Sequence, residues 1–318
     1  MTEIGHKLIC EEHGPNDLVE YATLADQSAF EYAMISDHYH PWTSTQGESP
    51  FVWNVIGAIA QATDDLRLGT AITCPIIRYH PALIAQAAAT AGVQLPGRFF
   101  LGVGTGEKLS EHILGDRWPE HEVRLDMLRE AVDIIRTLWT GDTTSYHGEY
   151  YTVENAQIYT LPDELPPIRV AADGPKAART AGEIGDGLVG VAPDEELIET
   201  FEAGGGEDEP RYAELDICYA EDKQEAIETA YEIWPQAALP GELMWILPTP
   251  AHFEQATAAV SKDDIAELVV CGSDPDEHIE AIQEYIDAGF DHVTIHQIGP
   301  NQAEFMEFYE DEVLPAID

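Results

Sequence analysis

The sequence predicts a parallel (β/α)8 barrel. Short apolar runs alternate with longer amphipathic segments along the 318 residues, an alternation typical of βα units that build a parallel sheet. Eight such apolar runs are present, which equals the number of strands in this barrel. A doubly wound open sheet is the alternative, because a strand count does not distinguish a closed sheet from an open one. We expect one domain over residues 1–318.

Each expected strand is short and mostly apolar. The expected strands are Lys7–Cys10, Phe30–Ile35, Leu66–Ile72, Arg98–Val103, Ile168–Ala172, Gly187–Val191, Tyr212–Tyr219 and His292–His296. Helical periodicity lies between them, at Asn16–Gln27, Phe51–Thr63, Pro81–Leu95, Glu122–Trp139, Lys176–Ile184, Lys223–Ala238, Pro275–Ala288 and Gln302–Leu314. Gly174-Pro175 and Asp274-Pro275 mark two helix starts, because proline is favoured in the first turn.

Three stretches depart from the alternation. Asp142–Leu161 has β-rich flanks and predicts a hairpin. Leu239–Asp264 follows the seventh expected strand, and we interpret it as an insertion that covers the barrel mouth. Gly204–Gly206, three consecutive glycines among acidic residues, predict a flexible surface loop.

The charge of the chain excludes some functions and indicates an environment. Sixty acidic residues stand against 15 lysines and arginines, which gives a formal net charge of −45. Nucleic-acid binding is excluded, since phosphate contacts need a basic surface. A solvated acidic surface is typical of an enzyme kept soluble in high salt, where ions screen the self-repulsion. We therefore expect a halophilic cytosol.

Neither a membrane span nor a disulfide is expected. No apolar run reaches the roughly 18 residues of a transmembrane helix, and residues 1–6 do not resemble a signal segment. The four cysteines, Cys10, Cys74, Cys218 and Cys271, lie far apart without metal-site spacing. They are expected to be isolated buried thiols in a reducing cytoplasm.

Ser36–Trp42 is the strongest indication of an active site. The segment directly follows the apolar run Phe30–Ile35, and the carboxyl end of a barrel strand is where catalytic groups lie. We interpret His38 as a proton-transfer group rather than a metal ligand or a core imidazole. No third ligand follows His38 and His40 with recognisable metal spacing. Trp42 fits either the core or a cleft.

Two acidic residues follow other strands in the same way. Glu11 comes after the first expected strand, and Glu107 follows the glycine-rich run Gly102–Gly106. Either carboxylate fits a base or an ordinary surface acid. The glycines permit close backbone approach to a flat ligand or a phosphate, although their spacing departs from the dinucleotide fingerprint. The helix start after Asp173 likewise offers free N–H groups to a phosphate.

Several motifs occur together in the order of a known family: Ser36–Trp42, Leu68–Ile72, Gly102–Glu107, Ala171–Pro175 and Ser273–Glu277. The sequence resembles the luciferase-like, deazaflavin-dependent oxidoreductases over nearly its whole length. It is most similar to the glucose-6-phosphate dehydrogenase group that uses coenzyme F420. The resemblance implies a (β/α)8 barrel, a homodimer and a deazaflavin in the barrel mouth, with FMN as the less favoured cofactor and no metal.

The resemblance also implies which residues bind the coenzyme. Asp37 would contact the ring system, and Ala71-Ile72 corresponds to a non-proline cis peptide behind the ring. The other positions expected to contact the coenzyme are Cys74, Thr105, Gly106, Ser110, Asp173, Gly174, Lys176 and Ala177. Asp173 replaces a glycine of the family's phosphate loop, which places an acid close to a phosphate.

The implied reaction moves a hydride from an alcohol carbon to C5 of the deazaflavin. His38 would take the hydroxyl proton, and Glu11 would share or hold that role. Trp42 would steady the alkoxide. Glu107 would protonate the ring nitrogen.

The positions that hold the substrate phosphate in the family's sugar-phosphate enzymes differ here. They correspond to Asp194, Gln255 and Leu268, with Val191 beside them. None is basic and one is acidic, so a phosphate loses its partners. We predict a neutral alcohol or unphosphorylated sugar as substrate in place of glucose 6-phosphate. The alternatives are a family reductase of a C=C, C=N or pterin substrate, a flavin-dependent monooxygenase, and a coenzyme carrier without turnover.

Overall fold

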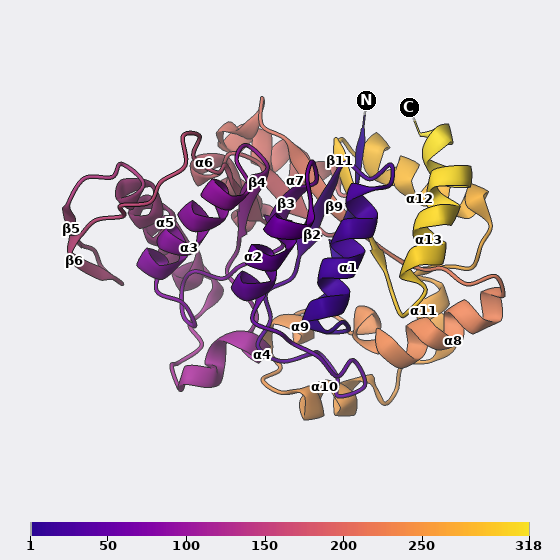
Figure 1. The fold of residues 1–318 in the computed structure, drawn as a ribbon. Coiled ribbons are helices and arrows are strands. Elements are labelled where there is room, and N and C mark those ends of the chain that lie inside the picture. Colours follow the sequence, from indigo (N-terminus) through magenta and orange to yellow (C-terminus); the bar gives the residue numbers. More distant parts are fainter. Residues whose placement is uncertain (1, 318) are drawn as a thin grey trace.

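The computed structural model describes residues 2–317, and its central element is a closed barrel of parallel strands (Figure 1). The barrel strands are β1 (Glu3–Leu8), β2 (Tyr32–Ile35), β3 (Arg67–Thr70), β4 (Phe99–Val103), β7 (Ile168–Ala171), β8 (Leu188–Gly190), β9 (Arg211–Cys218) and β11 (His292–Gln297). Pairing of β8 with β9 closes the sheet. The predicted (β/α)8 barrel is therefore confirmed, and the open doubly wound sheet is excluded.

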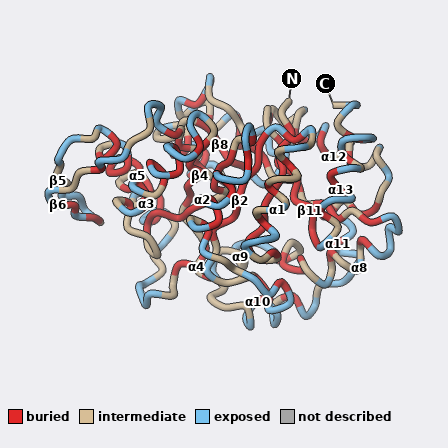
Figure 2. The backbone as a smooth tube through the Cα atoms, viewed as in Figure 1, coloured by how far each residue is buried: buried red, intermediate tan, exposed pale blue. Residues whose placement is uncertain are grey.

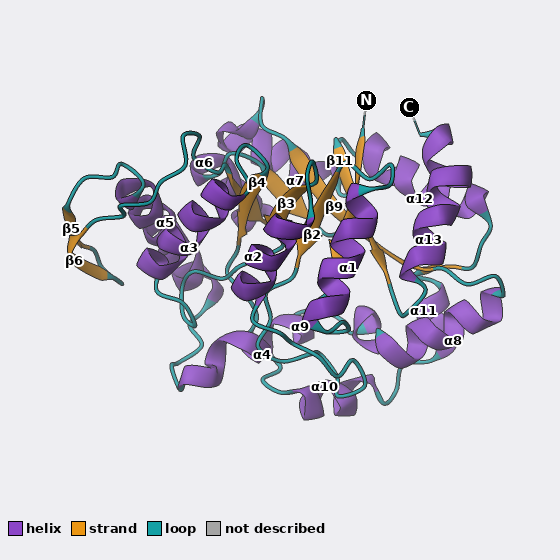
Figure 3. Ribbon diagram, in the orientation of Figure 1, coloured by secondary structure: helices purple, strands orange, loops and turns teal. Residues whose placement is uncertain are grey.

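Helices surround the barrel on its outer face (Figure 3). They are α1 (Pro15–Asp26), α2 (Val52–Ala62), α3 (Pro81–Gln94), α5 (His121–Leu138), α6 (Pro175–Ile184), α7 (Glu195–Phe201), α8 (Lys223–Ile233), α12 (Pro275–Asp287) and α13 (Gln302–Phe308). Most buried residues lie between these helices and the strands (Figure 2). Within residues 2–317, no helix is both long and apolar enough to cross a membrane.

Aromatic side chains fill the barrel interior near the amino-terminal ends of the strands. Tyr32, Phe100 and Tyr212 pack there with Met34 and Val189. Glycine makes room for two of the rings: a Cβ at Gly5 would lie 2.3 Å from the Tyr32 ring, and one at Gly69 would lie 1.9 Å from the Phe100 ring. This part of the barrel is thus a packed core.

The two predicted excursions are confirmed. Residues 142–161 contain the antiparallel hairpin of β5 (Thr144–His147) and β6 (Thr152–Ala156). The insertion after β9 folds into three short helices, α9 (Leu243–Ile246), α10 (Pro250–Thr257) and α11 (Lys262–Ala266). In Figure 1 the helices α9 and α10 lie below the barrel, beside α4 (Lys108–Glu111), at the carboxyl ends of the strands.

Several boundaries differ from the predictions for identifiable reasons. The helix expected over 223–238 stops at Ile233, because the residue before Pro235 is forced out of helical geometry. The helix expected over 302–314 continues beyond Phe308 only as a π-helical turn. A further short strand, β10 (Val270–Cys271), pairs with the end of β9.

The expected flexible loop at Gly204–Gly206 is wrong. These residues form a π-helical turn that packs against α6. A Cβ at Gly182 would lie 2.2 Å from the Phe201 carbonyl oxygen, so the two backbones approach closely. Glycine serves close packing here rather than mobility.

Candidate active site

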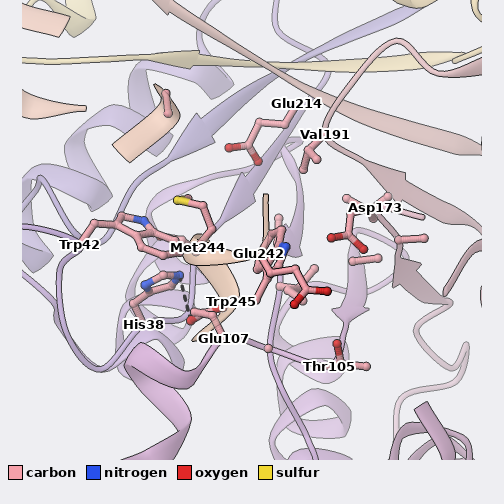
Figure 4. A pocket seen from close by; sticks show the side chains of 18 of the residues that line it. His38, Trp42, Thr105, Glu107, Asp173, Val191, Glu214, Glu242, Met244 and Trp245 are labelled. Carbon is pink, nitrogen blue, oxygen red and sulfur yellow. Dashed lines mark ion pairs between the residues drawn. The ribbon is translucent and has the colours of Figure 1, made fainter. Parts of the chain in front are cut away.

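A cavity of about 780 Å³ lies at the carboxyl ends of the barrel strands. Its walls come from strand ends far apart in the sequence and from the insertion, which contributes Met244, Trp245 and Ile246. Figure 4 shows His38 and Trp42 on one side and Asp173 on the other. The volume is within the range of about 300–1,000 Å³ typical of ligand and cofactor sites.

His38 lies between two carboxylates inside this cavity. Its Nδ1 is 3.3 Å from Glu11 Oε1. Its Nε2 is 3.4 Å from Glu107 Oε1, an ion pair drawn as a dashed line in Figure 4. Glu11 follows β1, His38 follows β2 and Glu107 follows β4. Because the carboxyl ends of parallel strands meet at one end of the barrel, residues 96 positions apart become neighbours (107 − 11 = 96).

The two carboxylates control the protonation of His38. Burial of the ring lowers its pKa, but Glu11 and then Glu107 raise it, and the net result is a raised pKa. The His38 side chain is only 11% exposed, so these interactions are weakly screened. The Nδ1 atom has no hydrogen-bond partner of good geometry within residues 2–317. The imidazole is therefore a buried group with its protons available for transfer.

Neighbouring side chains fix this arrangement. The Ser36 hydroxyl donates to Glu11 Oε2 and accepts the Cys10 N–H at 2.8 Å. The Trp42 ring lies 4.9 Å from His38, centroid to centroid, and its far side contacts Phe253 of α10 at 5.1 Å. Trp42 consequently connects the insertion to His38 and also lines the cavity.

Asp37 is not among the residues that line the cavity, and its contact with the coenzyme ring stays a prediction. Its carboxylate accepts hydrogen bonds from Thr73 Oγ1 at 2.8 Å, Arg78 Nη2 at 3.0 Å and Tyr79 OH at 3.2 Å. Arg78 Nε also donates to Glu111 Oε1 at 3.2 Å. Burial raises the pKa of Glu111 to about 7, against the opposing effect of Arg78. Asp37 belongs to a buried network that holds the loop behind His38.

The other residues expected to bind the coenzyme divide into two groups. Ala71, Ile72, Thr105, Gly106 and Asp173 line the cavity, and the Ala71–Ile72 peptide is cis. The remainder are not among the lining residues, and their contact with the coenzyme stays a prediction: Cys74, Ser110, Gly174, Lys176 and Ala177.

Each of these five residues has a packing or hydrogen-bonding role in the structure. Cys74 packs beneath Gly106, where an added Cβ would lie 2.7 Å from its sulfur. Ser110 Oγ accepts the Tyr39 N–H at 3.1 Å. Lys176 is exposed and pairs with Glu122. Gly174 is the N-cap of α6, and Ala177 is a core residue of that helix.

Only two of the four expected substrate residues line the cavity. Val191 and Leu268 do so. Asp194 instead caps α7, accepting the N–H groups of Glu196 at 2.9 Å and Leu197 at 3.2 Å. Gln255 is exposed on α10, where its Nε2 donates to the Ala251 carbonyl at 2.8 Å. Asp194 and Gln255 thus have structural hydrogen bonds outside the lining, and their contact with the substrate stays a prediction.

The sequence analysis missed a charged wall formed by β1, β9 and β11. Lys7 Nζ pairs with Glu214 and donates to the Ala71 carbonyl at 3.0 Å. Asp216 accepts from Trp234 Nε1 at 2.9 Å and lies 2.7 Å from His296 Nδ1. Glu214 and Asp216 are two residues apart on β9, so their side chains lie on the same face of the strand. That alternation was the available signal.

The charged side chains of this wall largely use one another as hydrogen-bond partners. Although Glu214, Asp216 and His296 have ligand atoms within 4.8 Å of one another, both ring nitrogens of His296 already face carboxylates, the second being Glu12 at 3.3 Å. Burial lowers the pKa of His296, but these hydrogen bonds prevail and raise it to about 10. The two carboxylates therefore favour the protonated form of His296 and hold its ring in place. His40 is also structural, because its Nδ1 bonds the Leu109 carbonyl at 3.1 Å outside the cavity.

Comparison with known proteins agrees with the fold and the motifs. The sequence profile of the luciferase-like monooxygenase family matches residues 2–292. An F420-dependent glucose-6-phosphate dehydrogenase of Beutenbergia cavernae is 36% identical over 329 residues, which covers 100% of this chain and 98% of that enzyme. The corresponding enzyme of Nocardia farcinica is 37% identical over 329 residues, with coverages of 99% and 98%.

Solved structures extend the comparison. An F420-dependent secondary alcohol dehydrogenase, in complex with an F420-acetone adduct, matches with a TM-score of 0.92 at 31% identity and covers 100% of this chain and 99% of its own. The tetrahydromethanopterin reductase of Methanopyrus kandleri has a TM-score of 0.82 at 23% identity, with coverages of 100% and 99%, and supports the fold alone. The chain belongs to the luciferase-like monooxygenase family.

Proposed function

We propose that this protein is a coenzyme F420-dependent dehydrogenase that acts on the CH–OH group of a neutral alcohol or unphosphorylated sugar. The observation that carries the proposal is His38 held between Glu11 and Glu107 in a cavity at the barrel mouth. Relatives that use F420 on a sugar phosphate and on a secondary alcohol support it. In keeping with the family, we further propose a homodimer in a salt-rich cytoplasm.

The residues around the cavity fit a flat deazaflavin. Ala71, Ile72, Thr105 and Gly106 present a wall of backbone and small side chains. A side chain at Gly106 would clash with Cys74 and Glu111, so this part of the wall stays open. When bound, F420 supplies the carbon that accepts the hydride. The wall would hold the ring, and the protein would supply orientation and proton transfer.

Each catalytic residue has a distinct proposed role. His38 receives the hydroxyl proton of the alcohol, because its ring lines the cavity and the two carboxylates beside it stabilise the imidazolium that forms. Glu11 holds the ring orientation and stabilises the imidazolium that forms. Trp42 shapes the substrate pocket and directs its indole towards the oxygen that becomes an alkoxide. Glu107, 3.4 Å from His38, carries the proton that the coenzyme nitrogen requires.

The charge of the cavity supports a neutral substrate. Near the reacting centre the lining carries Glu11, Glu107, Glu214 and Asp216. Lys7 is already paired with Glu214 and buried. A phosphate placed beside these four carboxylates would be repelled, because close like charges repel strongly in a buried site.

The substrate proposal is tested by steady-state reduction of F420 in molar KCl. We expect secondary alcohols or neutral sugars to give a higher kcat/KM than glucose 6-phosphate. Glucose and glucose 6-phosphate form the matched pair, since they differ only in the phosphate. A clear preference for the phosphorylated sugar would contradict the neutral-substrate proposal while leaving the coenzyme assignment intact.

Glu11→Gln should shift the pH dependence of alcohol oxidation to lower pH. Oxidation needs neutral His38, so kcat/KM rises with pH through the pKa of that residue in the free enzyme. Glu11 raises this pKa, and its neutralisation lowers it. Profiles of kcat/KM against pH check the shift, with the exposed Glu48→Gln as control. An acid limb that stays in place or moves upwards would contradict the role of Glu11.

A further inference from the structure

Arg78 connects two segments of the barrel mouth. It lies in the turn after β3, and its side chain is only 6% exposed. Its Nη2 donates to the Asp37 carbonyl oxygen at 2.7 Å and to the Asp37 carboxylate at 3.0 Å. Its Nε donates to Glu111 Oε1 at 3.2 Å, and its backbone N–H donates to Glu111 Oε2 at 2.8 Å. Arg78 therefore joins the segment after β2 to the helix α4.

These two segments carry His38 and Glu107. Asp37 directly precedes His38, so the bond to its carbonyl fixes the backbone from which the imidazole extends. Glu107 is the N-cap residue of α4, and its carbonyl accepts the Glu111 N–H at 3.2 Å. The guanidinium of Arg78 thus holds both sides of the 3.4 Å approach between His38 Nε2 and Glu107 Oε1.

The guanidinium is itself held in one orientation. Its carbon lies 4.4 Å from the centroid of the Tyr79 ring, and its Nη1 donates to Tyr79 OH at 3.1 Å. Tyr79 OH donates in turn to Asp37 Oδ1 at 3.2 Å. A planar guanidinium offers its donors in fixed directions, which the ammonium of a lysine does not reproduce. The connection therefore depends on the shape of Arg78 as well as on its charge.

Arg78 is one of four charged groups that act on the His38 ring. Burial lowers the pKa of His38, Glu11 and Glu107 raise it, Arg78 lowers it and Asp37 raises it. These groups come from the segments that follow β1, β2, β3 and β4. Because a lysine at position 78 would keep the positive charge, a weaker effect of Glu107 on His38 in that variant would report a change in geometry.

We propose that Arg78 is a positioning residue for proton transfer, which holds His38 and Glu107 against each other at the barrel mouth. Arg78 is not among the residues that line the cavity, so it acts through these two residues. This inference rests on the proposed function, in which His38 takes a proton from the alcohol and Glu107 provides one to the coenzyme. A fixed contact keeps both groups at the place of reaction.

The first test measures the pKa of His38 by NMR of 15N-labelled histidine in the protein without coenzyme, with His38→Gln to assign its signal. Glu107→Gln should lower this pKa, because Glu107 raises it. In an Arg78→Lys background the same substitution should lower it by about half as much or less, since coupling is lost when two groups separate. Arg136→Lys, an exposed arginine that pairs with Asp186, is the control and should leave the full effect.

The second test measures turnover. Arg78→Lys should lower kcat for alcohol oxidation by about 10- to 100-fold, the order expected when a reacting group is displaced by about 1 Å, and should change KM less. Glu111→Gln loosens the same connection from α4 and provides a second variant if the Arg78→Lys protein does not fold. It should likewise reduce the effect of Glu107→Gln on the pKa of His38.

Two results would overturn the inference. One is an effect of Glu107→Gln on the pKa of His38 that is equally large with and without Arg78→Lys or Glu111→Gln, even if kcat falls, because Arg78 would then have only a structural role. The other is no effect of Glu107→Gln in the otherwise unmodified protein. If the coupling falls as expected but no alcohol is oxidised, the positioning role is supported and the proposed function fails.

Discussion

His38→Gln is expected to lower kcat for alcohol oxidation by about 100- to 10,000-fold, the usual contribution of a positioned acid–base group. Glutamine has a similar size and polarity but cannot accept the hydroxyl proton. The pair of carboxylates at Glu11 and Glu107 would then face an amide that cannot become charged. Affinity for F420 should change little, because His38 is proposed to contact the alcohol.

Turnover and coenzyme binding should be measured on the same preparation. His40→Gln is the matched control, since it removes an imidazole two residues away that lies outside the cavity. Retained F420 affinity shows that the barrel mouth is intact in both variants. A His38→Gln variant whose kcat is nearly unchanged would show that another group takes the proton. Glu11 would be the first candidate.

The folded protein is expected to lose most of its stability when salt is removed. Sixty acids against 15 bases place many carboxylates near one another on the surface. The lysines do not relieve this repulsion: Lys176, Lys223 and Lys262 each already pair with one glutamate. The Debye length is about 3 Å at 1 M salt and about 30 Å at 0.01 M, so dilution exposes each carboxylate to many others.

Thermal unfolding across this range of KCl concentrations measures the effect. We expect the Tm to rise steeply with KCl. Sucrose at equal osmolality is the control, because it stabilises through exclusion from the protein surface without screening charge. A Tm that does not change between 0.01 M and 1 M KCl would contradict the halophilic interpretation.

The part of the site that the sequence predicted lies at strand ends. Glu11, His38 and Glu107 each follow an apolar run, and parallel topology forces such residues together at one end of a barrel. The fold is predictable for the same reason, because the alternation of short and long segments is a local property. Neither prediction requires knowledge of the side-chain contacts in the folded protein.

The parts that the sequence did not predict depend on packing and register. Asp194 and Gln255 were assigned by position, but both fall in segments after strands, where helix geometry decides direction. Asp194 is a preferred residue for an N-cap, and it has that role here. Arg124, which lines the cavity from α5, was missed because helical periodicity does not say which face reaches a cavity. Asp37 was assigned to the coenzyme from the family resemblance, and its bond to Arg78, 41 positions away, could not be predicted from the sequence.

The central claim is that the alcohol carbon gives its hydrogen directly to the coenzyme while His38 takes the hydroxyl proton. The most direct test uses an alcohol deuterated at the carbinol carbon, with mass spectrometry of the reduced F420. We expect one deuterium per turnover to be recovered in the coenzyme and no oxygen to be consumed. Deuterium released to water, or a product that contains oxygen from O2, would contradict it and would indicate monooxygenase chemistry on the same barrel.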